Sequence, residues 1–260
     1  MFNRRIKVLR KLFLFIITAV LLISCEEETT LTFSEESFTN KTLKECADNS
    51  CPKIDITLLR AEGNSELVDI INTKTDSIII NTLSISPDDE ERISTIQDGL
   101  DNIILSYREF KQDFPTSASE YEIITESRIS YESSQIISIA IESYSYWGGA
   151  HGYGSIRYLN FDRDEQIYLN TDRLIKNKTA FLKEAENRFR SQQNIPADAD
   201  INSSGYFFEN NTFSLPQNIG FKEGNVVLVF NPYEVASYAE GQIMLNIPLA
   251  SIKDYLAVTL

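Results

Sequence analysis

The sequence predicts an α+β fold, in which a long amphipathic helix and a second, shorter helix pack on antiparallel β-sheet. Two observations carry this prediction. Strand-like runs rich in β-branched and aromatic residues follow one another across short turns, and apolar residues recur at three- and four-residue steps from Ile93 to Phe114. The chain has 260 residues, of which 42% are hydrophobic, so it can bury a substantial core.

The first half of the chain is expected to contain three strands and the long helix. The strands are predicted over 54–59, 66–71 and 77–85. Ser86 then resembles a helix N-cap, with Pro87 at the first helical position and an acidic pair after it for a capping box. Pro115 is expected to end this helix.

In the second half of the chain, apolar residues again alternate with polar ones at every second position, as in strands. Alternation from Glu120 onward predicts consecutive antiparallel strands up to Phe161, and a shared apolar face predicts the shorter helix over 179–192. A polar loop is expected over 196–205. The remaining predictions are strands over 226–230 and 242–247, and a helical turn over 249–256.

The N-terminal segment has the pattern of an export signal. Five basic residues precede an apolar run of about a dozen residues, which is short for a permanent membrane span. The sequence Leu22–Cys25 resembles the bacterial lipobox, which implies that residues 1–24 are removed and that Cys25 carries the lipid, with palmitate-type chains, as an outer-membrane anchor. The alternative is a cysteine that ends a signal anchor by chance.

The charge balance bears on the class of partner. The chain has 24 Lys plus Arg and 38 Asp plus Glu, a net charge of -14. Removal of residues 1–24 takes five basic and no acidic residues, which leaves 19 basic and 38 acidic residues and a net charge of -19. Nucleic acid is therefore not an expected partner, because binding to phosphates needs a basic face. Residues 25–40, which begin with Glu26–Glu28 after the anchor, are predicted to form an acidic tether, and both periplasmic and surface-exposed placement stay open.

The small number of His and Cys residues restricts the chemistry. Cys46 and Cys51 are expected to form a disulfide in an oxidising compartment, ahead of the strand near Lys53. Metal and cofactor sites are not expected, and the EF-hand-like spacing of acids from Asp198 to Glu209 is interpreted as a polar surface loop because a serine replaces the turn glycine. His151 is the single histidine and no G-x-S-x-G motif is present, so an enzyme is not expected.

The turn within 144–154 is the best candidate for a binding surface. It gathers the only Trp, the only His, three Tyr and four of the ten Gly between two predicted strands. Rigid aromatics with polar tips are typical of recognition surfaces and sugar platforms. The candidate binding residues are Tyr146, Trp147, Gly148, Gly149, His151 and Tyr153. The alternative is a structural hairpin, whose aromatics pack on the neighbouring helix and whose histidine bonds a local carbonyl.

Two segments carry a resemblance to a known family. YSYWGGAHGYGSIRYLNFD at 144–162 and FNPYEVASYAEGQIMLNIPLASIKDYL at 230–256 resemble the paired extracytoplasmic domains of unknown function shared by RsiV-type anti-sigma factors and PdaC-type peptidoglycan deacetylases. The resemblance covers roughly 38–258 and implies an N-terminal α+β domain over 41–163 and a C-terminal one over 164–260. In RsiV-type receptors this region binds lysozyme, whereas in PdaC-type enzymes it accompanies a separate deacetylase domain, to which no segment here is similar.

These observations together predict a lipid-anchored, exported envelope protein that acts as a non-enzymatic binding module. Its expected partner is lysozyme or another cationic wall-active protein, which a strongly acidic body would attract. The alternatives are a module that binds peptidoglycan or another polysaccharide, and a hydrolase that acts on cell-wall material.

Overall fold

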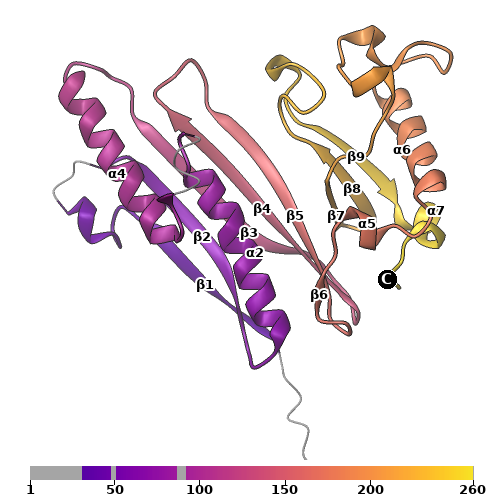
Figure 1. Ribbon diagram of the computed structural model, residues 1–260, viewed down its shortest axis with the longest axis horizontal. Helices are drawn as coiled ribbons and strands as arrows, with labels where there is room; N and C mark the ends of the chain where they lie inside the picture. Colours follow the sequence, from indigo (N-terminus) through magenta and orange to yellow (C-terminus); the bar gives the residue numbers. More distant parts are fainter. Residues whose placement is uncertain (1–30, 48–50, 87–91, 260) are drawn as a thin grey trace, which may run out of the picture. The chain divides into compact units, whose positions relative to one another are not determined.

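The computed structural model describes residues 31–47, 51–86 and 92–259, in which the strands form two sheets (Figure 1). The predicted signal segment 1–24, the lipidation site Cys25 and the acidic run Glu26–Glu28 lie outside these residues. None of the described helices combines the length and apolar character needed to span a bilayer.

The larger sheet has six strands, each next to its neighbour in sequence. They are β1 (Thr32–Thr39), β2 (Lys53–Glu62), β3 (Tyr121–Glu132), β4 (Ile136–Trp147), β5 (Tyr153–Asp162) and β6 (Ile167–Tyr168). All neighbours are antiparallel except β2 and β3, which run parallel. The exception follows from the chain order, because α2 (Glu66–Leu83) and α4 (Ile96–Asp113) lie between these two strands and supply the crossover that parallel neighbours need.

Three sequence predictions in this half are wrong. The run 66–71 and most of the run 77–85, both predicted as strands, belong to the helix α2, which ends at Leu83. Its buried residues recur at helical spacing and include Leu67, Ile71 and Ile79. Residues 32–39, predicted as part of the tether, form the edge strand β1 along β2. The α+β class and antiparallel pattern are otherwise as predicted.

The helix α4 begins later than the proline-based signal indicates. Its N-cap is Thr95, whose hydroxyl accepts from the Asp98 backbone while the Asp98 carboxylate accepts from the Thr95 backbone, a complete capping box. The predicted start at Ser86–Asp89 includes residues 87–89, which lie outside the described residues. The helix ends before Pro115, as predicted.

The smaller sheet belongs to the second half of the chain. It contains β7 (Asn218–Lys222), β8 (Asn225–Phe230) and β9 (Ile243–Pro248) in that order, all antiparallel. The helices there are α5 (Thr171–Leu174), α6 (Lys178–Gln192) and α7 (Leu249–Ile252). The second helix and the final helical turn are as predicted, whereas β7 was not predicted.

Figure 1 shows α2 and α4 on one side of the larger sheet, the smaller sheet on its other side, and α6 beyond the smaller sheet. Three clusters of buried apolar side chains hold these layers together. The first lies between α2, α4 and one face of the larger sheet. A small cluster joins the other face of that sheet to the smaller sheet, through Ala140 and Tyr158 on one side and Val227 and Val229 on the other. The third lies between the smaller sheet and α6. The order of layers is therefore helix, sheet, sheet, helix.

The two remaining cysteines pair as predicted. Cys46 and Cys51 form a disulfide with their Cα atoms 5.3 Å apart, immediately before β2 begins at Lys53. The bridge closes a short loop that leads from β1 into β2.

Candidate functional site

The turn between β4 and β5 is shaped by its glycines. Gly148 has φ +76°, a conformation that side chains rarely adopt, and a Cβ there would lie 3.3 Å from the Tyr121 ring. The Tyr146 hydroxyl donates to the carbonyl oxygen of Gly149 at 2.9 Å, which holds the phenol against the turn. Gly149 is itself exposed.

Strand alternation divides the predicted binding residues between the two faces of the larger sheet. Trp147 and Tyr153 lie on the face that α2 and α4 cover, and Tyr146 lies on the opposite face. The Trp147 ring meets the Tyr121 ring edge-on with centroids 5.7 Å apart, and Tyr121 stacks on Phe110 of α4 at 5.4 Å. The structure therefore does not bring the predicted residues together as one surface, and Trp147 packs as the structural alternative expects.

His151 contacts the second half of the chain. Its ring stacks on the Tyr238 ring with centroids 3.8 Å apart and an angle of 21° between planes. Its Nδ1 lies 3.2 Å from the carbonyl oxygen of Gly152, to which the Tyr238 hydroxyl also donates at 2.8 Å. Within the described residues no serine, cysteine or carboxylate hydrogen-bonds to the imidazole.

Tyr233 completes a ring cluster, defined here as His151, Tyr233 and Tyr238. Its hydroxyl lies 3.5 Å from His151 Nε2, and its ring centroid lies 5.7 Å from that of Tyr238. Tyr233 has φ +70°, an unusual conformation for a bulky residue, in a turn closed by the Glu234 N–H donating to the Asn231 carbonyl oxygen at 3.1 Å. The two segments that carry the family resemblance thus meet at this cluster.

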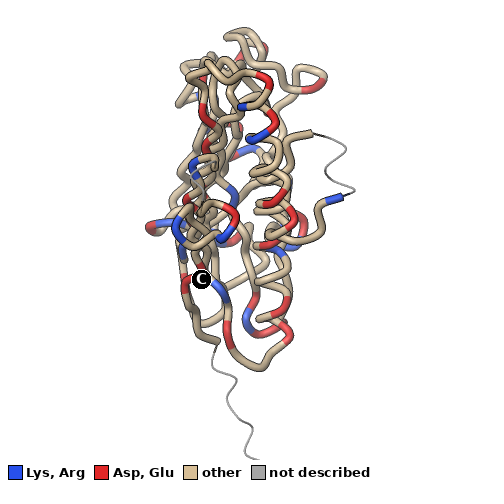
Figure 2. Tube along the Cα trace, turned by 90° about the vertical axis from the view of Figure 1, so that its left-hand side faces the viewer, with Lys and Arg blue, Asp and Glu red and all other residues tan. Residues whose placement is uncertain are grey.

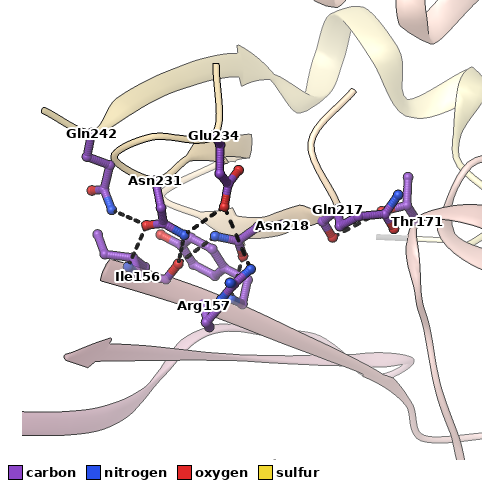
Figure 3. Close-up of polar contacts among 9 residues, drawn as sticks. Ile156, Arg157, Thr171, Gln217, Asn218, Asn231, Glu234 and Gln242 are labelled. Atoms are coloured by element: carbon purple, nitrogen blue, oxygen red, sulfur yellow. Dashed lines mark hydrogen bonds and ion pairs between the residues drawn. The ribbon is translucent and has the colours of Figure 1, made fainter. Parts of the chain in front are cut away.

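Two asparagines join the second half of the chain to the free edge of β5 (Figure 3). The Ile156 N–H donates to Asn231 Oδ1 at 3.0 Å, and the Ile156 carbonyl accepts from the amides of Asn231 at 3.2 Å and Asn218 at 2.5 Å. The Tyr158 N–H donates to Asn218 Oδ1 at 2.8 Å. We call Asn218 and Asn231 the asparagine clamp, because their side-chain amides replace the hydrogen bonds that a neighbouring strand would make.

The clamp is buried and reinforced. Asn218 is 3% exposed and Asn231 is 2% exposed. Gln242 donates to Asn231 Oδ1 at 2.8 Å, and Arg157 lies 3.9 Å from Glu234 in a loose ion pair (Figure 3). This junction fixes the loop 231–242 beside the larger sheet.

An open groove of about 580 Å³ lies where that loop meets the sheet face away from the helices. We call it the acidic groove. Its walls carry the carboxylates of Glu126 and Glu142 together with Tyr144 and Tyr238, and no basic side chain is among the described residues that line it. Glu142 is paired with Arg128, whereas Glu126 makes no ion pair among the described residues.

The groove also exposes apolar surface. Ile124 is 37% exposed and Tyr144 is 38% exposed, both next to these carboxylates. A face that combines exposed apolar and aromatic side chains with carboxylates can bind a long cationic side chain, since its stem packs on the rings and its charge meets the acids.

Reasoning from the sequence did not single out Glu126, Glu142, Asn218 or Asn231. The acids are two among 38 in the chain, so their type carries no signal. The clamp could have been suspected at Asn231, because a polar residue directly after the apolar run of β8 and before a proline is typical of a turn with a special role.

Two family models match the chain and confirm the resemblance. The model described as "Deacetylase PdaC" matches residues 45–153, and the model described as "Protein of unknown function (DUF3298)" matches residues 165–250. The chain therefore contains a match to each of the two domains that the resemblance implies.

A curated protein and two solved structures are similar to the chain. It is 26% identical over 153 residues, 57% of its length, to the peptidoglycan-N-acetylmuramic acid deacetylase PdaC of Bacillus subtilis, and the match covers 32% of that protein. The chain thus spans about a third of the length of this relative.

The solved structures are those of two DUF3298 family proteins. The protein from Pseudomonas aeruginosa has a TM-score of 0.54 and 17% identity, with 88% of this chain and 93% of that chain covered. The protein from Bacteroides fragilis has a TM-score of 0.57 and 17% identity, with 89% and 94% covered. These similarities confirm the α+β fold.

Proposed function

We propose that this chain, a PdaC domain followed by a DUF3298 domain, is an exported, lipid-anchored envelope protein that binds a cationic wall-active protein and is not itself an enzyme. The domain pair supports a place at the cell wall outside the cytoplasm, since the curated relative is a peptidoglycan deacetylase. The lipobox-like segment ending at Cys25 supports the anchor, which would hold the protein at the outer membrane.

The acidic groove is the observation that carries the binding proposal. It presents Glu126 and Glu142 beside Tyr144 and Tyr238, and the part of its lining that the structure describes has no basic residue. Acidic positions are also spread along the whole described trace (Figure 2). The surrounding field would increase the rate at which a cationic protein meets the groove, and the groove would provide the contact.

Binding to lysozyme, a strongly basic wall-active protein, tests this proposal. We expect biolayer interferometry to detect binding that weakens from low to moderate salt, because surface charges are screened. Glu126→Gln should weaken it about fivefold, since an exposed ion pair contributes on the order of 1 kcal/mol. The matched control is Glu165→Gln, an exposed acid in the turn between β5 and β6. No binding at micromolar protein at either salt, or an equal effect of both variants, contradicts the proposal.

The non-enzymatic part of the proposal has its own test. Wall-derived glycans are incubated with the wild type and with His151→Ala, and release of sugars or acetate is measured. We expect no turnover with either protein. Turnover by the wild type that His151→Ala loses while it stays folded would establish an enzyme instead.

A further inference from the structure

A second pocket opens mainly on the face of the larger sheet that the helices cover, and it shares only Ser143 and Ser155 with the lining of the acidic groove. Its volume is about 510 Å³, within the range of roughly 300–1,000 Å³ typical of small-molecule sites. It is bounded by the C-terminal end of α2, including Asn81 and Thr82, and by the β4–β5 hairpin with Trp147 and Tyr153.

The sequence of β4 explains why the pocket exists. Along the face that the helices cover, β4 changes from the buried Ile139 and Ile141 to Ser143 and Ser145. The serines fill less volume than isoleucines and begin where α2 approaches its end at Leu83. A hollow with a hydroxyl-rich floor results, where continued isoleucine would have extended the core.

The lining is rich in polar groups that the protein itself leaves unused. Within the described residues, the side chains of Asn81, Ser145, Ser155 and Gln217 make no hydrogen bond to another residue, although all four line the pocket. Such groups are donors and acceptors arranged around a cavity, ready for a ligand with many hydroxyl or amide groups.

Aromatic rings and one cation complete the lining. Trp147 and Tyr153 lie at the hairpin end, and Tyr168 comes from β6. The Tyr153 and Tyr168 phenols are hydrogen-bond donors at neutral pH, and burial raises the pKa of both above its ordinary value. Arg157 is the single charged residue among the described residues of the lining. The Glu234 carboxylate lies 3.9 Å from the Arg157 guanidinium, beyond hydrogen-bond distance, so the guanidinium has donors available for a ligand.

We propose that this pocket binds a disaccharide-sized sugar that carries a carboxylate. Sugar rings offer apolar faces to aromatic side chains and hydroxyls to the serine and amide groups, and the planar guanidinium of Arg157 matches a carboxylate. The charged residues of the two sites differ, since Glu126 and Glu142 line only the acidic groove and Arg157 lines only this pocket, so binding of the sugar does not depend on binding of a cationic protein.

Trp147 is the only tryptophan of the chain, so its fluorescence reports on this pocket directly. The probes are the disaccharide of N-acetylglucosamine and N-acetylmuramic acid, whose lactyl group bears a carboxylate, and chitobiose, which lacks that group. We expect saturable changes in emission at millimolar sugar with the acidic disaccharide and about tenfold weaker binding of chitobiose. Tenfold corresponds to about 1.4 kcal/mol, within the range for a charged hydrogen-bonded pair.

Two variants separate the contributions to this binding. Arg157→Gln should remove the preference for the acidic sugar while binding of chitobiose persists. Ser145→Leu, which fills the floor of the pocket, should abolish binding of both sugars, and thermal melting checks that each variant is folded. Glu165→Gln, at an exposed position in the turn between β5 and β6 that lines neither pocket, serves as the control and should bind both sugars like the wild type.

Three outcomes would overturn the proposal. They are an unchanged Trp147 emission with both sugars in the wild type, equal binding of the two sugars, and full binding by a folded Ser145→Leu variant. None of them bears on the lysozyme experiment, since that experiment reports on the opposite face of the sheet.

Discussion

The asparagine clamp makes a quantitative prediction for Asn231→Ala. The substitution removes the acceptor of the Ile156 N–H, which donates at 3.0 Å, whereas the Ile156 carbonyl keeps the amide of Asn218. Water cannot readily replace the lost group, because Asn231 is 2% exposed. An orphaned buried donor costs about 1–3 kcal/mol, so we expect the free energy of unfolding to fall by about 2 kcal/mol.

A double-mutant cycle sharpens this prediction. Asn218→Ala orphans the Tyr158 N–H by the same argument. The double variant also deprives the Ile156 carbonyl of both its amide donors, which neither single variant does. The loss of unfolding free energy in the double variant should therefore exceed the sum of the two single losses by about 1 kcal/mol, as expected for residues in one hydrogen-bond network.

The assay is urea unfolding, followed by Trp147 fluorescence and by far-UV circular dichroism. The matched control is Asn246→Ala, an exposed asparagine of β9, which should change stability by less than about 0.5 kcal/mol. If Asn231→Ala is no less stable than this control, or if the cycle is additive, the clamp does not hold the edge of β5 as we argue.

Two further predictions concern packing and pH. Gly220→Ala places a Cβ 2.1 Å from Tyr158 Cγ between the sheets, so it should lower the free energy of unfolding, measured by thermal melting, by at least about 3 kcal/mol. Gly154→Ala, with open space around the new Cβ, should leave stability nearly unchanged. Hydrogen bonds from Thr95 and from Ser94 hold the pKa of the Asp98 carboxyl below its ordinary value. The stability that Asp98 contributes is therefore fully present above the unfolded-state pKa, and it is lost as the pH falls through the folded-state pKa. Asp98→Asn should remove that dependence of stability on acid in thermal melts from pH 7 to 3. Thr95→Ala should lower the free energy of unfolding by about 1 kcal/mol. If Asp98→Asn leaves the acid profile unchanged, the capping box does not contribute as we argue.

The fold could be predicted where local pattern and tertiary role agree. The apolar stripe of α4 has the period of a helix, and the alternation in β3, β4 and β5 has the period of a strand. In α2 the local pattern and the tertiary role disagree, because runs such as Ile78–Ile80 favour a strand locally, while burial of Ile71 and Ile79 against the sheet stabilises the helix. The edge strand β1 could not be recognised, because its side chains are mostly exposed or half-exposed and polar and leave no alternation to detect.

The candidate site could be predicted only in part for a similar reason. The glycine and aromatic content marked the turn at 148–152, and this turn does contact the second half of the chain through His151. Strand alternation places the neighbours Tyr146 and Trp147 on opposite faces of the sheet, but which of the two faces the helices cover depends on tertiary packing that the local pattern does not give. The clamp arises from contacts of Ile156 with Asn218 and Asn231, which lie 62 and 75 residues further along the chain, and both pockets also join segments distant in sequence. No local pattern encodes these contacts.

The asparagine clamp also affects self-association. β6 pairs with β5 only at Phe161 and Asp162, so among the described residues no strand is hydrogen-bonded to most of the outer edge of β5. Such an edge is a template on which another molecule can add a strand and begin to aggregate. Side-chain amides occupy the groups of Ile156 and Tyr158 without offering a new strand that could itself be extended. We therefore expect the clamp to prevent polymerisation through the edge of β5, and its loss to lower the solubility of the protein as well as its stability.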